Sequence, residues 1–524
     1  MNSRIYFFLF ALGLIPPIVI AQFQPAPGYL DSDYYFAGGL QLAMGRGFNE
    51  PYLWNYLDGT TSLPHPSHSY WMPLASIISA LGMWLTGQTI YASGRLFFIL
   101  IAGLVSPLTA ALAYKFSQNR ALAVISGLLA IFSVYHAPFV GVTDNFGPYM
   151  LFGGLFFVCS SQLIEKPSQP GNWFFLGLLA GLMNLARTDG LLWLALAFLF
   201  SLWCAPKNDR VGAVKFVLVN SSIVTAGFLL VMGPWYGRNL EIYGTPMAPG
   251  GSRTLWLDNY DQTFTYPSAE LTMQSFLSLG WMEILSDRLW ALKLNVQSGF
   301  AAHGGIILFP FIVAGIIRYR EDRRVKLALF AWLSLFGVMT LIFPFAGARG
   351  AFFHAGAALQ PMWWTLAPLG LDAILLALRK RSWGNDQTIH IFRSALVLIT
   401  AILTVFVVYL RLFGENLGWG EGEDQYPQVE EFLLREGIAP GDIVIVRNAP
   451  GYYLETGRSA IVIPYGDEQT ILEVSAQFNA GYLVLERKAA LEPLQDLYND
   501  PDGNQHFIYL GELDDTRIYR IELE

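Results

Sequence analysis

Two acidic residues, Asp31 and Asp33, directly follow the first apolar run of this 524-residue chain, in the stretch PGYLDSDYYF. Ionisable side chains at a membrane boundary are costly and are often functional. Residues two apart point in different directions in a helix, so the two carboxylates need not share a role there. One could act as a general base while the other binds a cation. The plainer alternative is that both are solvated acids that cap the segment after them.

Two histidines, His65 and His68, lie farther along the same loop in LPHPSHSYWMP. Imidazole nitrogens spaced in this way, together with a carboxylate, are suitable ligands for a divalent metal ion. The spacing fixes no third ligand, so an ordinary pair of polar loop histidines is the alternative.

Other ionisable residues gather at the ends of apolar runs. Asp144 begins the fourth run in GVTDNFGPY, Arg187 and Asp189 lie between two runs in LARTDG, and Arg238 follows another run in PWYGRN. Arg349 is a further cation at such a boundary, and Arg253, His303 and His354 are additional candidates. Guanidinium groups at the headgroup plane suit a phosphate-bearing lipid. The alternatives are a helix N-cap for Asp144 and snorkelling arginines.

The composition indicates which kinds of domain carry these residues. Apolar residues make up 54% of the chain and charged residues only 14%, whereas soluble proteins average about 25% charged residues. A chain so poor in charge cannot cover a soluble surface of this size, so most of it must face lipid. The first 420 residues carry a net charge of +6 and residues 421–524 a net charge of −14. We therefore expect a membrane domain over 1–420 and an acidic soluble domain over 421–524.

Eleven apolar runs are long enough to be considered as membrane spans, each of which needs about 20 residues. They cover 4–22, 95–114, 121–139, 147–164, 173–187, 190–205, 214–234, 303–317, 326–345, 358–378 and 393–412. A shorter run at 73–87 is predicted to lie at the interface or to re-enter. The first run has a signal peptide as its alternative. Cys159 and Cys204 fall inside apolar runs and suit buried side chains better than a disulfide.

Charge placement orients this scheme. With a cytoplasmic N-terminus, 16 of the 25 basic residues in the first 420 fall on the cytoplasmic side, mostly in short connections. The long loops 23–94 and 235–302, the loop around Asp144, the turn at Arg187 and the C-terminal domain are then extracytoplasmic. We expect an integral protein of the cell membrane whose chemistry takes place on the outer face.

The last hundred residues alternate between strand-like and helix-like segments. DIVIVR, AIVIP, YLVLER and HFIYLG are typical of short buried strands, VEEFLLREG and TILEVSAQF of helices, and TRIYRIEL of a closing edge strand. This alternation predicts a small α/β domain around a mainly parallel sheet. Its expected role is structural or acceptor-orienting.

The set of outer motifs resembles the membrane-embedded GT-C glycosyltransferases. The resemblance rests on a first span followed by DxDYY, an outer loop with an acid, an R-x-D-G turn and PW-x-x-RN, and it covers roughly residues 1–350. The branch it resembles most is that of the protein O-mannosyltransferases and aminoarabinose transferases. Many members have a second acid directly after the first, whereas this chain has Ser32 there and Asp33 one place later.

The resemblance implies an activity and roles for several residues. It implies transfer of a hexose or pentose from a polyprenyl-phosphate donor to a lipid, glycan or protein acceptor, with inversion. Asp31 is then the catalytic carboxylate, with Asp33 as the other first-loop acid. Asp144 supports the acceptor or a divalent metal ion, and Arg187 and Arg238 lie near the donor phosphate. Arg349 is a further candidate for a phosphate contact. The expected partners are the donor, the acceptor and the membrane, and no nucleic acid.

Two other functions fit a polytopic chain. A transporter usually shows internal repeats and discontinuous polar helices near the midplane, and this sequence shows no repeat. A non-catalytic scaffold that presents the acidic domain would leave the two long, aromatic-rich outer loops without a purpose. The sequence specifies neither the sugar nor the acceptor.

Overall fold

A computed structural model describes residues 1–381, 385–414, 418–420 and 425–523. The described chain forms two compact units, and each is built from segments that lie far apart in the sequence. Unit 1 consists of Met1–Pro25, Arg95–Arg238 and Arg288–Gly418. Unit 2 consists of Ala26–Gly94, Asn239–Asp287 and Trp419–Glu524. The first long loop, most of the second and the C-terminal segment therefore form one body.

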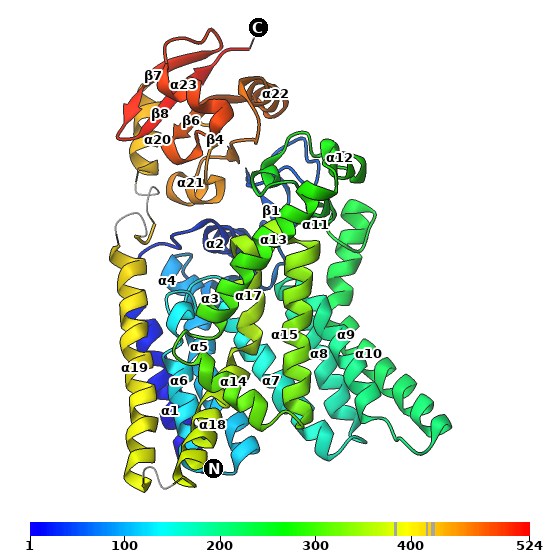
Figure 1. The fold of residues 1–524 in the computed structure, drawn as a ribbon. Helices are drawn as coiled ribbons and strands as arrows, with labels where there is room; N and C mark the ends of the chain where they lie inside the picture. Colours follow the sequence, from blue (N-terminus) through cyan, green and yellow to red (C-terminus); the bar gives the residue numbers. More distant parts are fainter. Residues whose placement is uncertain (382–384, 415–417, 421–424, 524) are drawn as a thin grey trace. The chain divides into compact units, whose positions relative to one another are not determined.

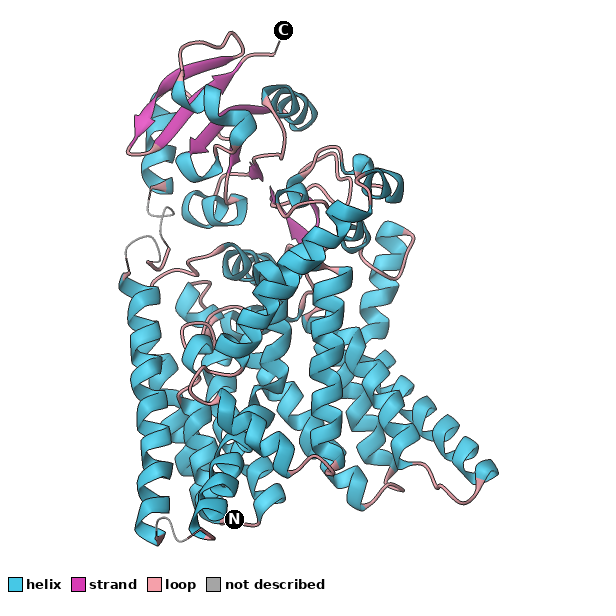
Figure 2. Ribbon diagram, viewed as in Figure 1, coloured by secondary structure: helices cyan, strands magenta, loops and turns pink. Residues whose placement is uncertain are grey.

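Unit 1 is helical (Figures 1 and 2). Its long helices are α1 (Ser3–Ala21), α5 (Leu96–Ser117), α6 (Arg120–Ile131), α7 (Phe146–Glu165), α8 (Pro170–Ala186), α9 (Leu191–Cys204), α10 (Arg210–Tyr243), α13 (Trp281–Ser298), α14 (Phe309–Arg318), α15 (Arg323–Gly337), α18 (Gln360–Arg379) and α19 (Asp386–Phe413). The last residues of α10 and the first residues of α13 belong to unit 2. Short helices occupy the turns, namely η1 (Val134–His136), η2 (Thr188–Gly190), η6 (Gly299–His303), η7 (Val338–Ile342), α16 (Pro344–Ala346), η8 (Gly347–Ala351), α17 (Phe352–Gly356) and η9 (Ala357–Leu359).

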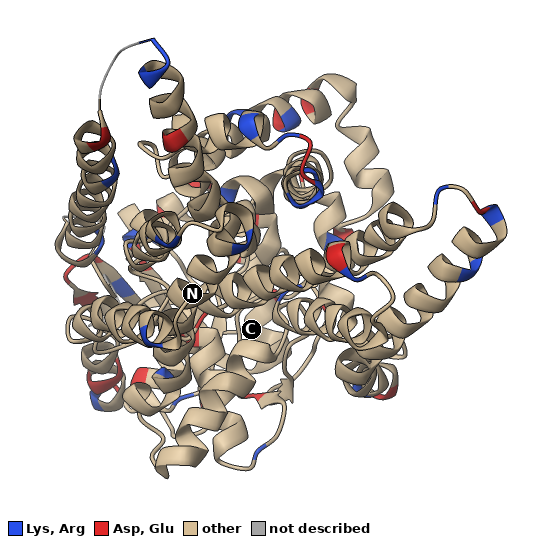
Figure 3. Ribbon diagram, turned by 90° about the horizontal axis from the view of Figure 1, so that it is seen from below, with Lys and Arg blue, Asp and Glu red and all other residues tan. Residues whose placement is uncertain are grey.

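Each of the eleven apolar runs contains a helix. Among the described residues, seven helical segments are long and apolar enough to cross a membrane, and four shorter apolar helices accompany them. These helices make the chain an integral membrane protein, as the composition predicted. Charged residues are sparse along the helices and gather near their ends, as the coloured ribbon in Figure 3 shows. Helix α13 lies inside the predicted outer loop 235–302, where no apolar run indicated it.

The packing of α14 against α18 depends on the absence of a side chain. A Cβ placed on Gly370 in α18 would overlap the carbonyl oxygen of Phe311 in α14. The backbone of both helices is helical here, so Gly370 is needed for the close approach of α18 to α14 and not for an unusual φ. Close backbone contact through small residues is a common way to pack helices in membranes.

Unit 2 mixes helices with short strands. Its first-loop elements are α2 (Leu30–Ala43), β1 (Asn49–Glu50), β2 (Tyr52–Leu53), β3 (His65–Pro66), α3 (Leu74–Thr86) and α4 (Tyr91–Gly94). The second loop adds α11 (Pro249–Arg253), η3 (Thr254–Trp256), η4 (Asp261–Phe264), η5 (Ser268–Glu270) and α12 (Met273–Ser278). The C-terminal elements are α20 (Tyr426–Arg435), β4 (Ile443–Val446), α21 (Ala449–Thr456), β5 (Ala460–Val462), α22 (Glu468–Phe478), β6 (Ala480–Glu486), η10 (Arg487–Ala489), η11 (Glu492–Leu494), α23 (Gln495–Asn499), β7 (Phe507–Leu513) and β8 (Thr516–Ile521).

The predicted α/β domain is present, with one error in strand order. The six-stranded sheet has the order β2-β5-β4-β6-β8-β7, parallel from β2 to β6 and antiparallel from β6 to β7. The stretch TRIYRIEL forms β8, which lies between β6 and β7, so its prediction as an edge strand was wrong. The chain reverses at Asp514–Asp515, and β8 then pairs with β6 on one side and β7 on the other.

The strand at the other edge, β2, comes from the first loop. Tyr52 and Leu53 pair in parallel with Ala460 and Ile461 of β5, across about four hundred residues of sequence. Leu53 and Tyr56 are buried in the same hydrophobic core as the C-terminal strands. The Tyr56 hydroxyl also donates a hydrogen bond to the Val462 carbonyl. The first loop is therefore an integral part of the C-terminal sheet.

The run at 73–87 forms α3, a 13-residue helix. At 1.5 Å per residue its length is about 20 Å, short of the roughly 30 Å hydrocarbon core. It belongs to unit 2 and packs against α2. The prediction that this run does not span the membrane agrees with this length.

Candidate active site

The two acids of the first loop occupy the first turn of α2, where the helix dipole favours negative charge. Their surroundings differ. Asp31 is half-buried, whereas Asp33 is only 1% exposed. The Asn448 side chain donates a hydrogen bond to Asp33 at 2.8 Å, and the same side chain caps α21 by accepting from the Gly451 N–H. Asp33 is therefore a buried acid held by the C-terminal segment, not a solvated loop acid.

His65 and His68 are buried in the same unit, but each makes its own contacts. His65 Nε2 lies 2.8 Å from Glu50, and its Nδ1 lies 3.9 Å from Asp58. His68 contacts the hydroxyls of Ser67 and Ser76 through its two ring nitrogens, at 2.7 and 3.0 Å. These bonds engage the imidazoles with protein partners, as expected of structural histidines.

The buried His65–Glu50 pair shifts the titration of both groups. Burial alone would lower the pKa of His65, but the charge and hydrogen bond of Glu50, together with the charge of Asp58 and the bond to the Pro66 carbonyl, outweigh burial and raise that pKa above its usual value. Burial raises the pKa of Glu50, and the nearby His65 opposes the shift only in part. The pair links β1 to β3, which are hydrogen-bonded neighbours.

In unit 1, Asp144 lies just before α7 and is 1% exposed. Its Oδ1 accepts a hydrogen bond from the Asn145 N–H at 2.5 Å and lies 3.7 Å from Nδ1 of His354. The helix N-cap residue is Asn145, so Asp144 is not the cap itself. The His354 ring in turn packs against Phe146, with 4.0 Å between ring centroids. Unit 1 thus holds a buried carboxylate–imidazole pair.

Arg187 ends α8, and its side chain is 15% exposed. Its Nε donates to Asp189 at 2.8 Å, and the other oxygen of Asp189 accepts from the Tyr149 hydroxyl at 3.2 Å. The guanidinium lies 5.9 Å from the Tyr149 ring centroid. An acid and an aromatic ring therefore fix the orientation of this cation.

The RTDG turn is also tied to the PWYGRN stretch. Asn184 donates to the carbonyl oxygens of Arg187 and Thr188, at 3.4 and 3.2 Å, and accepts from the Tyr236 hydroxyl at 3.2 Å. Two of the motifs that carried the resemblance are thereby in contact within unit 1. Arg238, two residues after Tyr236, lies over the Trp235 ring at 4.6 Å.

The segment from η8 to α17 connects the acid to the cation. Ala351 accepts a hydrogen bond from Arg187 Nη2 at 3.3 Å, and His354, three residues later, lies beside Asp144. Arg349 belongs to this segment and is exposed. The structure thus brings Asp144 and Arg187 into one network, with Arg349 on the segment that joins them.

Sequence reasoning missed Arg95, which is only 3% exposed. Its Nε donates to the Gly141 carbonyl at 3.0 Å, and its Nη atoms donate to the backbone and side-chain oxygens of Gln24 at 3.0 and 2.8 Å. Gln24 donates to the Pro138 carbonyl at 2.9 Å. These bonds hold the loop that carries Asp144 against the end of α1. The sequence feature that could have identified Arg95 is its place as a lone arginine at the start of a long apolar run.

The donor atoms in unit 1 suit a divalent metal ion. Asp144 offers a carboxylate oxygen and His354 an imidazole nitrogen, both common ligands for zinc and similar ions. Two ligands do not make a complete site, and such an ion would require others.

No family model matches this chain, and no curated protein matches it in sequence. Solved structures do match its fold over almost its whole length. ArnT from Cupriavidus metallidurans, solved with undecaprenyl phosphate, is 12% identical with a TM-score of 0.54, and the match covers 99% of this chain and 98% of that one.

An oligosaccharyltransferase from Archaeoglobus fulgidus, tethered to an acceptor peptide, is 14% identical with a TM-score of 0.55, covering 99% of this chain and 74% of that one. A second structure of this oligosaccharyltransferase, a complex with zinc and sulfate, is 13% identical with a TM-score of 0.55, covering 97% and 72%. At such identities the likeness shows the fold. The GT-C fold that the motifs predicted is therefore confirmed.

Proposed function

We propose that this chain is a glycosyltransferase that moves a sugar from a polyprenyl-phosphate donor to an acceptor hydroxyl at the extracytoplasmic face of the membrane. The observation that carries the proposal is the network in unit 1 that joins Asp144, His354, Ala351 and Arg187. It supports the proposal because these contacts connect a buried acid to a cation whose orientation is fixed. The matched ArnT structure contains undecaprenyl phosphate, which is consistent with a lipid-linked donor.

The proposed reaction is a single displacement. The acceptor oxygen attacks the anomeric carbon of the sugar, and the bond from that carbon to the phosphate oxygen breaks. The polyprenyl phosphate leaves with the electron pair, and a carboxylate takes the acceptor proton. One displacement inverts the anomeric centre.

Asp31 is assigned the role of the base, since it is the half-buried acid of the pair whereas Asp33 is buried and held by Asn448. General base catalysis of this kind contributes about 10²–10⁴-fold in rate. The resemblance also assigns the first acid of the motif to this role.

Arg187 is assigned to the leaving phosphate. Asp189 and Tyr149 hold its guanidinium before any ligand binds, so little reorganisation is needed when charge develops on the phosphate oxygen. Arg238 and Arg349 are assigned as further phosphate contacts. A divalent ion on Asp144 and His354 would add positive charge for the same purpose.

Transfer from defined donors tests the proposal. Purified protein in nanodiscs is given undecaprenyl phosphate carrying radiolabelled glucose, mannose or 4-amino-arabinose, together with a membrane extract as acceptor. We expect release of undecaprenyl phosphate and label in the extract with one of the donors. Arg187→Gln should slow transfer strongly, whereas exposed Arg435→Gln serves as the matched control. If no donor is consumed while proteoliposomes accumulate a solute, the chain is a transporter.

A further inference from the structure

Unit 2 contains a polar cavity of about 700 Å³, within the range of about 300–1,000 Å³ typical of small-molecule sites. One wall comes from the second loop and the other from the C-terminal domain. Tyr465 joins the walls, because its N–H donates to the Phe264 carbonyl at 3.0 Å and its backbone pairs with Thr265. The side-chain network assigned to donor chemistry belongs to unit 1, whereas the residues that line this cavity belong to unit 2.

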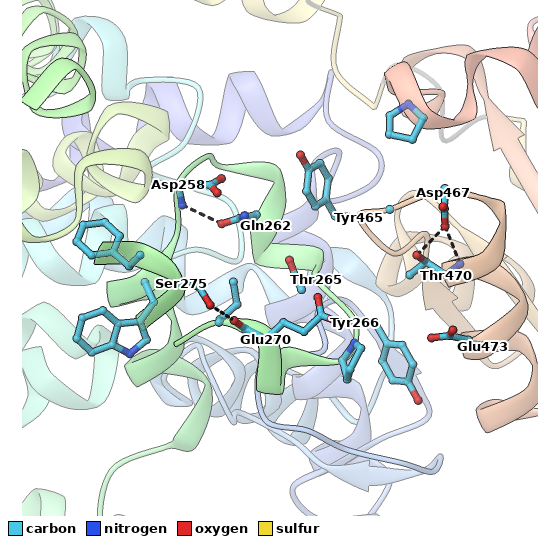
Figure 4. A pocket seen from close by; sticks show the side chains of 16 residues that line it. Asp258, Gln262, Thr265, Tyr266, Glu270, Ser275, Tyr465, Asp467, Thr470 and Glu473 are labelled. Atoms are coloured by element: carbon cyan, nitrogen blue, oxygen red, sulfur yellow. Dashed lines mark hydrogen bonds between the residues drawn. The ribbon is translucent and has the colours of Figure 1, made fainter. Parts of the chain in front are cut away.

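The charge of the cavity selects against anions. Four carboxylates line it, from Asp258, Glu270, Asp467 and Glu473, and the described lining includes no Lys, Arg or His. Figure 4 shows them around the cavity, Asp258 and Glu270 on the second loop and Asp467 and Glu473 on the C-terminal domain. A phosphate group would be repelled here, whereas hydroxyl and amino groups would find acceptors.

The cavity also has aromatic walls. Trp256, Phe276, Tyr266 and Tyr465 contribute to the lining together with the carboxylates. Apolar ring faces beside convergent hydrogen-bond acceptors suit a sugar ring, which has C–H faces and an equator of hydroxyls.

Thr265 gives independent evidence for a polar ligand. It lines the cavity, is only 7% exposed, and its Oγ1 has no hydrogen-bond partner within the part of the chain that the structure describes. Figure 4 shows Thr265 among the labelled side chains in the middle of the cavity. A buried hydroxyl without a partner costs about 1–3 kcal/mol, and a ligand hydroxyl would remove that cost.

A second cavity of about 450 Å³ adjoins the first. The two share Trp256, Tyr266 and Pro267 as lining residues. Hydroxyl groups line the second cavity as well, from Thr60, Thr61 and Ser268. Its lining also includes one guanidinium, of Arg253, and one carboxylate, of Asp58, so the excess of negative charge in the double cavity comes from the first cavity. Two polar cavities that share aromatic side chains suit a linear chain of several sugar units better than one compact molecule.

We infer that this double cavity binds a non-acidic oligosaccharide as the acceptor of the transfer. The Thr265 hydroxyl and the four carboxylates contact sugar hydroxyl or amino groups, and Trp256 and Tyr266 pack against ring faces. The acceptor role rests on the proposed function, whereas binding of the saccharide does not depend on it.

Binding is measured on the full-length protein in nanodiscs, without donor, by titration calorimetry with three trisaccharides of different charge. Amine-bearing chitotriose should bind more tightly than neutral N-acetylchitotriose, and anionic trigalacturonic acid should not bind. Thr265→Val should weaken binding about tenfold, as expected for loss of one hydrogen bond.

Thr263→Val is the matched control on the same loop. Thr263 is also buried, but its hydroxyl donates to the Tyr260 carbonyl at 2.7 Å. This variant should lower the melting temperature and leave saccharide affinity unchanged. Thr265→Val should keep or raise the melting temperature, because its hydroxyl has no internal bond to lose and removing it relieves the cost of burying it. Trp256→Ala provides a second test of location by removing a ring that both cavities share.

Three outcomes would overturn the inference. One is the absence of binding for both chitotriose forms, another is binding that neither Thr265→Val nor Trp256→Ala weakens, and the third is binding of an oligolysine peptide in place of the saccharides. None of them touches the proposed function, which fails only if no sugar leaves any polyprenyl-phosphate donor. Transfer of label onto a trisaccharide, reduced in Thr265→Val, would support both.

Discussion

Asp31 and Asp33 lie in one helical turn but have different surroundings, and on that ground we propose different roles for them. Asp33 is buried and accepts a hydrogen bond from Asn448, whereas Asp31 is half-buried. The DxD spacing alone left the roles open. Asn448 is more than four hundred residues away in the sequence, and no local pattern could have shown that it contacts the second acid.

Asp31→Asn should reduce the rate of sugar transfer about 10²–10⁴-fold, because the amide cannot take the acceptor proton. Its melting temperature should fall less than that of Asp33→Asn, because Asp31 is only half-buried. Asp33→Asn should lower the melting temperature, since it replaces a buried carboxylate that accepts the Asn448 amide. Transfer assays and thermal melts on the two variants separate these effects. Full activity in Asp31→Asn would disprove its assignment as base.

The His65–Glu50 pair predicts a pH dependence of stability. The folded-state pKa of His65 lies above its unfolded value of about 6.5, so the stabilisation is fully present below that pH. It is lost as the pH rises through the folded pKa. The pKa of Glu50 is raised as well, so its contribution to stability is also lost as the pH rises, over a lower pH range. The melting temperature should therefore fall as the pH rises above about 6.5.

His65→Gln should flatten this part of the profile. His506→Gln is a control in the same unit, because the His506 ring contacts only a backbone carbonyl among the bonds described for it. A profile that stays equally steep in His65→Gln would show that other groups cause the pH dependence.

At the scale of elements, the apolar runs predicted helices well because lipid imposes a simple rule. Every backbone group in the hydrocarbon must be bonded within its own segment, so length and hydropathy suffice to find the helices. The same rule gives no information on unit 2. Tyr52–Leu53 is too short to be read as a strand, and β8 was misplaced because a sequence pattern fixes a strand's faces but not its neighbours.

The close approach of α14 and α18 is tested by adding one methyl group. Gly370→Ala should destabilise the protein by about 1–3 kcal/mol, since the new Cβ would overlap the Phe311 carbonyl. Gly337→Ala in α15 is the matched control. A Cβ there meets no atom within 4 Å, and alanine favours helix by up to about 1 kcal/mol. Equal melting temperatures for the two variants would contradict the packing described.

At the scale of the whole molecule, the sidedness inferred from charge is open to a direct test. In a background with Cys159→Ser and Cys204→Ser, single cysteines replace exposed Gly441 in unit 2 and exposed Arg320 in unit 1. A membrane-impermeant maleimide should label Gly441→Cys on intact cells and Arg320→Cys only after permeabilisation, because basic connections remain cytoplasmic. The reverse pattern would invert the topology.

The pairing of β2 with β5 also sets an order of events during synthesis. Leu53 leaves the ribosome long before Ile461, its partner in the sheet. At about 5–20 residues per second, this interval lasts roughly 20–80 s. During that time Leu53 and Tyr56 lack the C-terminal strands with which they share a hydrophobic core. The nascent first loop is therefore a natural client for a chaperone, and a chain that stops before β5 leaves it open to proteolysis.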